Sequence, residues 1–164
     1  MLKVFISFSG ADAPLVNRLQ AIAGAMPGIE VYRFDHDARP GIQLAEKVKR
    51  AIRAAHVVVV LLTKTARDSA WVQQEIGIAE QASKLIVPIV ERSVDVPGVL
   101  QGREYVELDT NDPAGAFQRA AKYLGRIDAR MRAAAKRVAD RKAVIAGVTL
   151  LVGSIIAIAA GADD

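Results

Sequence analysis

Apolar residues along the chain follow two periods, and these predict strands and helices in turn. Five short apolar runs have the length of β-strands, at residues 3–8, 29–34, 56–62, 85–90 and 105–108. Between them, apolar residues recur at helical spacing over 14–26, 44–55 and 70–83, and a last helix is expected to begin at Pro113. This alternation predicts an α/β, flavodoxin-like, doubly wound parallel sheet of about five strands.

The third run, His56 to Leu62, is apolar throughout and rich in valine, as in a central strand covered by helices on both faces. Pro88, inside the fourth run, predicts an edge position or a strand end. Residues 63–69 are expected to form a loop. In such sheets ligands bind beyond the carboxyl ends of the strands, so residues 8–12, 34–41 and 63–69 are the candidate ligand-binding loops.

Residues 143–162 form an apolar run of twenty residues without a charge or a proline. Twenty helical residues span about 30 Å, the thickness of a bilayer's hydrocarbon core. The preceding residues 126–142 carry seven basic and two acidic side chains. We therefore expect a domain over 1–125, a basic helical linker and one transmembrane helix, with the domain in the cytoplasm because basic flanks stay there. The alternative is a buried C-terminal helix of a soluble domain.

The net charge of +4 reflects that linker, since residues 1–125 carry 15 basic and 14 acidic side chains. A nearly neutral domain lacks the basic face of a nucleic-acid-binding protein, so no nucleic-acid partner is expected. The chain has no cysteine, and His36 and His56 lack a metal-ligand spacing, so no metal site is expected. The glycine-rich motifs of dinucleotide-binding and P-loop proteins are absent, and Thr63 stands where a receiver domain has its aspartate.

The helix predicted over 70–83 carries a carboxylate on its apolar face. At about 100° per residue, Glu75 shares one stripe with Trp71 and Ile78. Val72 and Ile76 widen this apolar arc. A carboxylate placed there must be paired, protonated or used in chemistry. Two interpretations remain open: a structural group paired with a Lys or Arg, or lying at the rim of the face, and a catalytic group.

Three short segments occur in order along the predicted fold. Val4–Phe8 lies in the first strand, Arg39–Gly41 precedes the second helix, and Asp68–Glu75 leads into the third. They resemble the first conserved box, the BB loop and the Ser-x-Trp-x-x-x-Glu segment of bacterial-type Toll/interleukin-1 receptor (TIR) domains. The resemblance covers residues 1–125. The Phe-Trp pair of the family's third box is missing, but that box is not part of the catalytic constellation.

The resemblance implies a choice between two activities. Some TIR domains cleave NAD at the nicotinamide–ribose bond, as hydrolases or cyclases, and bacterial examples serve in antiphage defence. In them the glutamate matching Glu75 is catalytic. For this chain we expect NAD as a substrate, no resident cofactor, and activation by self-association. The residues expected to bind the substrate are Phe8, Ser9, Phe34, Arg39 and Trp71.

Other TIR domains are scaffolds that bind only other TIR domains. The first alternative is therefore a non-enzymatic adaptor that recruits TIR proteins, or further copies of itself, to a membrane. A second is a nucleotide-sensing domain that controls the apolar helix as a membrane effector. Retention of Glu75 favours the enzyme.

Overall fold

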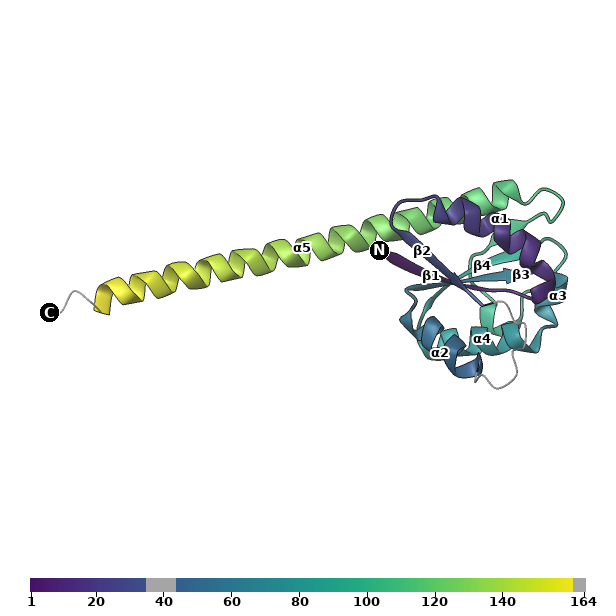
Figure 1. The fold of residues 1–164 in the computed structure, drawn as a ribbon, viewed down its shortest axis with the longest axis horizontal. Helices are drawn as coiled ribbons and strands as arrows, with labels where there is room; N and C mark the ends of the chain where they lie inside the picture. Colours follow the sequence, from purple (N-terminus) through teal and green to yellow (C-terminus); the bar gives the residue numbers. More distant parts are fainter. Residues whose placement is uncertain (35–43, 161–164) are drawn as a thin grey trace. The chain divides into compact units, whose positions relative to one another are not determined.

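The computed structural model describes residues 1–34 and 44–160, and it contains one five-stranded parallel sheet (Figure 1). The strands are β1 (Leu2–Ser7), β2 (Ile29–Arg33), β3 (Val57–Leu62), β4 (Leu85–Glu91) and β5 (Val106–Leu108). They lie in the order β2-β1-β3-β4-β5, and every neighbouring pair is parallel. The predicted α/β sheet is confirmed, and its strand order reverses between β1 and β3, where such folds bind ligands.

Helices connect the strands. They are α1 (Ala13–Gly24), α2 (Leu44–Ala54), α3 (Lys64–Arg67), α4 (Ala70–Gln81) and α5 (Ala114–Ala160), with 3₁₀ turns η1 (Gly10–Asp12) and η2 (Gly98–Leu100). The loop predicted over 63–69 is wrong, because the Thr63 hydroxyl accepts the Ala66 N–H at 3.1 Å and caps α3. The connection from β4 to β5 contains only η2, so the helix–strand alternation is incomplete.

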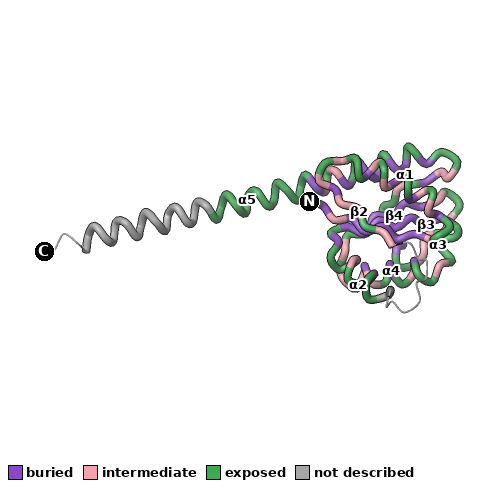
Figure 2. Tube along the Cα trace, viewed as in Figure 1, coloured by how far each residue is buried: buried purple, intermediate pink, exposed green. Residues whose placement is uncertain are grey.

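The sheet separates two apolar cores, and its strands are mostly buried (Figure 2). The first core includes Val16 and Leu19 of α1 together with Phe117 and Leu124 of α5. The second core lies on the other face and joins α2, α3 and α4 to the sheet. β3 is buried along its whole length, as its apolar run predicts. Each such side chain contributes about 1.5–3 kcal/mol by leaving water.

β4 lies between β3 and β5, so the edge position predicted from Pro88 is wrong for the strand as a whole. The register explains why proline is tolerated. Pro88 pairs with Val60 of β3, whereas pairing with β5 begins only at Ile89, opposite Val106. The first half of β4 thus has a strand partner on one side only, and a missing N–H donor there costs little.

The chain divides into two compact units, residues 1–128 and 129–164. In the second unit the helix continues, and the side chains of residues 129–142 are exposed. Among the residues whose side chains the structure describes, no helix combines the length and the hydropathy needed to cross a membrane. The side chains of residues 143–162, on which the predicted span depends, lie outside that set.

Candidate active site around Glu75

Glu75 lies in the middle of α4, on the face that packs against the sheet. The helix begins after Ser69, whose hydroxyl accepts the Val72 N–H at 3.4 Å. Glu75 is 1% exposed, and its neighbours on this face, Val72 and Ile76, are fully buried. Its predicted position within the apolar face is confirmed, and a place at the rim of that face is excluded.

Ser7, the last residue of β1, binds the carboxylate directly. Its hydroxyl, itself completely buried, donates to Oε2 of Glu75 at 2.6 Å. This contact joins the carboxyl end of β1 to the centre of α4. Sequence reasoning missed Ser7 as a site residue. The available signal was the strand period: Ser7 shares a face with Phe5, two residues earlier, and is a polar residue on a buried face.

Burial raises the pKa of Glu75 from its ordinary 4.5 to about 7, and the Ser7 hydrogen bond opposes this by lowering the pKa. The rise follows because a carboxylate taken out of water loses its hydration, and the Ser7 hydrogen bond offsets only part of that loss. Near neutral pH the group therefore exists in both protonation states. A carboxylate held in an apolar setting interacts strongly with positive charge, so it is suited to stabilising a cation that forms beside it.

Trp71 and Phe34 are the two aromatic residues of the predicted site that lie on the Glu75 side of the sheet. Trp71 is one helical turn before Glu75 and 37% exposed, at the rim of the buried face. Phe34, just after β2, is half-buried against the second core, with its ring centroid 6.3 Å from that of Phe5. Their predicted contacts with a substrate stay predictions.

Phe8 lies elsewhere. It is 1% exposed and belongs to the first core, with Val16 and Leu19 of α1. Successive residues at the end of β1 point to opposite faces, so the side chain of Phe8 lies across the sheet from that of Ser7. The structure thus does not bring the Phe8 ring to Glu75. Ser9 is half-buried, with its carbonyl accepting the Asp12 N–H at 2.8 Å. Arg39 lies outside the described residues.

A second polar group at the carboxyl edge of the sheet holds the loops after β1 and β3 together. The Thr63 hydroxyl donates to Asp12 Oδ2 at 2.6 Å, and the Thr65 hydroxyl lies 3.1 Å from the same oxygen. Asp12 is 7% exposed, and burial raises its pKa while the two threonine hydrogen bonds lower it. Beside it, a Glu91 oxygen accepts the Lys64 N–H at 2.9 Å. These contacts tie η1, α3 and β4 together on the edge that carries Ser7.

The sequence matches known proteins over most of this unit. A family model described as the TIR domain matches residues 4–121. A probable 2′ cyclic ADP-D-ribose synthase of Brachypodium distachyon is 31% identical over 88 residues, which are 53% of this chain. The match spans 39% of that protein's length.

Solved structures show the same fold. The TIR domain of the Toll-related receptor TRR-2 from Hydra magnipapillata has a TM-score of 0.61 and 23% identity, covering 75% of this chain and 97% of that one. A prokaryotic SEFIR domain has a TM-score of 0.57 and 18% identity, covering 76% and 99%. A CMP N-glycosidase of Clostridium botulinum has a TM-score of 0.57 and 17% identity, covering 74% and 98%. From the match over residues 4–121 and the five-stranded parallel sheet, we conclude that this chain belongs to the TIR domain family.

Proposed function

We propose that this TIR domain cleaves NAD at the bond between nicotinamide and ribose, with Glu75 as the catalytic residue. The observation that carries the proposal is the buried Glu75 carboxylate, held by Ser7 at the carboxyl edge of the sheet. The relative named as a probable 2′ cyclic ADP-D-ribose synthase supports it, since such a product retains the ADP-ribose part of NAD. NAD is the substrate, and the reaction needs no resident cofactor.

The chemistry follows from the charge on the substrate. When the C1′–N bond of NAD breaks, its electron pair goes to the ring nitrogen. The cationic nicotinamide ring therefore leaves as a neutral molecule and needs no general acid. Positive charge develops on the ribose, as in glycoside hydrolysis. Ionised Glu75 stabilises this charge and orients the ribose hydroxyls. Attack by water then gives ADP-ribose and a proton, and attack by a hydroxyl of the substrate itself gives a cyclic product and a proton.

Two aromatic residues supply the apolar contacts with the substrate in this proposal. Trp71 provides a flat wall one turn from the carboxylate, and Phe34 provides a ring on the same side of the sheet. Ser9, which follows β1, and Arg39, which lies between β2 and α2 in the sequence, complete the predicted set with polar contacts. Ser7 acts as a positioning residue, because its hydroxyl binds the Glu75 carboxylate.

Glu75 is nearly inaccessible in the structure, so neighbouring side chains must move before a ribose reaches it. This supports activation by self-association with other TIR domains, most simply further copies of this chain, because a partner surface that favours the open arrangement would raise its population. An isolated domain would then turn over slowly, and a clustered one faster.

We further propose that the domain is tethered to a membrane by residues 143–162, with the basic residues 126–142 on the cytoplasmic side, in an antiphage or related immune-type response. The charge-free apolar run and its basic flank support this placement. Extraction of cell membranes with alkaline carbonate tests it. The full chain should remain with the membrane, and a chain ending at residue 142 should be released; release of both contradicts the tether.

The enzymatic proposal is tested by nicotinamide release from NAD. The full chain would be purified in detergent and assayed dispersed and artificially clustered, with Glu75→Gln as the test variant. Glu80→Gln is the matched control, since it makes the same chemical change on the same helix, where Glu80 pairs with Arg103. We expect release by wild type and by Glu80→Gln, stimulated by clustering, and none by Glu75→Gln.

Release by Glu75→Gln at the wild-type rate would keep the activity and remove Glu75 from its catalytic role. No release by clustered wild type would contradict the enzymatic proposal. An adaptor or a nucleotide sensor would then be the better account of the fold.

A further inference from the structure

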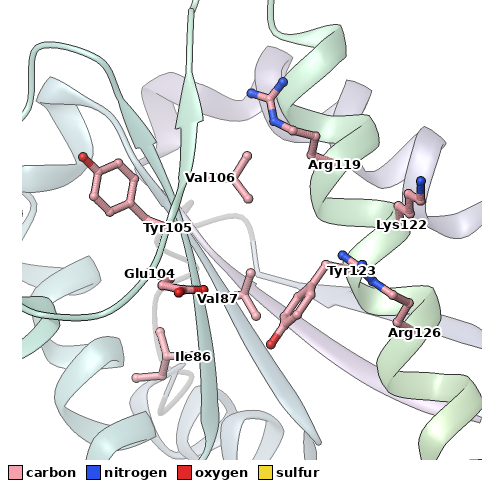
Figure 3. A pocket seen from close by; sticks show the side chains of 9 residues that line it. All are labelled: Ile86, Val87, Glu104, Tyr105, Val106, Arg119, Lys122, Tyr123 and Arg126. Atoms are coloured by element: carbon pink, nitrogen blue, oxygen red, sulfur yellow. The ribbon is translucent and has the colours of Figure 1, made fainter.

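The described structure contains a groove at the opposite edge of the sheet from Glu75. It lies between α5 and the beginnings of β4 and β5, and its volume is about 390 Å³ (Figure 3). The register of β4 accounts for it. Because β5 pairs only from Val106 onward, opposite Ile89, the first half of β4 is not covered by a strand on that side. We call this feature the basic groove.

The floor of the basic groove is apolar. Val87 of β4 and Val106 of β5 line it, and both contact the core that packs under α5. Tyr123 projects from α5 toward this floor (Figure 3), and the residue is 38% exposed. An accessible ring above two valines forms a surface on which a flat apolar group can stack.

The helix side of the groove is positively charged. Arg119, Tyr123 and Arg126 lie four and three residues apart, so they fall on one face of α5. The Arg126 guanidinium lies 5.7 Å from the centroid of the Tyr123 ring, and Arg119 donates to the Glu107 carbonyl at 3.0 Å. A guanidinium carries five N–H donors, so these contacts leave both arginines able to bind an anion.

The charges give the groove a preference for anions. The groove is lined by three basic side chains, Arg119, Lys122 and Arg126, and by one carboxylate, that of Glu104. An accessible aromatic ring with arginines on the same helix face matches a molecule with a flat ring and a phosphate. The groove volume is at the small end of ligand pockets, which run from about 300 to 1,000 Å³. A single nucleotide fits this size better than a dinucleotide such as NAD.

We propose that the basic groove is a second ligand site, which binds a nucleoside monophosphate. The phosphate is held by Arg119 and Arg126, and the base stacks on Tyr123 above Val87 and Val106. The site is separate from Glu75, since the groove lines the amino ends of parallel strands and Glu75 contacts a carboxyl end. Binding here is independent of whether the domain cleaves NAD.

Titration calorimetry of the full chain with adenosine monophosphate tests the proposal, with inorganic phosphate and adenosine as separate probes. We expect saturable binding of the nucleotide that is at least about tenfold tighter than that of either probe, because both halves of the molecule make contacts. Arg119→Gln and Arg126→Gln should each weaken binding about tenfold or more, since each loses a charged hydrogen bond. Tyr123→Ala should weaken it about fivefold or more, and Tyr123→Phe should not, because the ring is retained.

Arg18→Gln on α1 is the matched control, an exposed arginine outside the groove whose substitution removes the same charge. It should leave the affinity unchanged, and Glu104→Gln should increase it by removing the opposing charge. Circular dichroism checks that each variant is folded. Equal binding of nucleotide and phosphate overturns the stacking on Tyr123. Equal affinity of the arginine variants and wild type, or no saturation at millimolar nucleotide, overturns the site.

Discussion

Burial of Glu75 makes the stability of the protein depend on pH in a specific direction. Its pKa is about 7 in the folded chain, against an ordinary value of 4.5. Between these two pH values the Glu75 carboxyl is ionised in the unfolded chain but protonated in the folded chain. The unfolded state is therefore increasingly favoured as pH rises. Below 4.5 the carboxyl is protonated in both states, and above about 7 it is ionised in both and the penalty is constant. The full difference corresponds to about 3 kcal/mol, at about 1.4 kcal/mol per pH unit.

Glu75→Gln removes this penalty while its amide oxygen can still accept the Ser7 hydroxyl. Relative to wild type, the free energy of unfolding of the variant should therefore rise by about 3 kcal/mol between about pH 4.5 and pH 8. Urea denaturation of the full chain, followed by circular dichroism across this range, measures the difference. Comparing the two ends of the range cancels any constant effect of the amide on packing.

Glu104→Gln is the control, because it makes the same chemical change at an exposed position, where no burial penalty is removed. A difference between Glu75→Gln and wild type that does not change with pH would refute the burial argument. So would a difference that falls as pH rises, since that is the sign expected for a carboxylate stabilised by the fold.

Three further substitutions separate structural from chemical roles. Ser7→Ala should raise the pKa of Glu75 and, above about pH 8, lower the free energy of unfolding by about 1.5–3 kcal/mol, measured by urea denaturation. Thr63→Val keeps the side-chain shape but removes the cap of α3 and a hydrogen bond to buried Asp12, so a loss of about 2 kcal/mol is expected in the same assay; an unchanged midpoint would contradict the role of this cluster. Phe8→Leu should destabilise the protein by about 1–2 kcal/mol and leave the KM for NAD unchanged, whereas a raised KM would restore Phe8 to the site.

The sheet could be predicted from sequence because each strand is an apolar run between turn residues. The valine-rich run of β3, for example, has one stable location, between helices on both faces. Two features could not be read in this way. α3 begins where the Thr63 hydroxyl accepts the Ala66 N–H. Threonine makes similar hydrogen bonds to the backbone in loops, so the sequence alone does not distinguish the two conformations. The tolerance of Pro88 within β4 depends on where β5 begins, which is set by the register of another strand.

The candidate site was predictable where periodicity alone decides a position. Helical spacing placed Glu75 in the buried face, and the structure agrees. Strand alternation separates Ser7 from Phe8 just as directly, but Phe8 was assigned to the site by its motif and not by its face. The strand period marks Ser7 as a polar residue on a buried face, but it does not identify Glu75 as its partner, which is 68 residues away.

We propose that ionised Glu75 stabilises the positive charge formed as NAD is cleaved. The pH dependence of kcat/KM for nicotinamide release by the clustered full chain tests this most directly, since it reports the ionisation of the free enzyme. We predict that kcat/KM rises with pH through a single ionisation near 7, and that this rise moves to higher pH in Ser7→Ala. A kcat/KM that stays flat from about pH 5 to 9, or falls as Glu75 ionises, would contradict it.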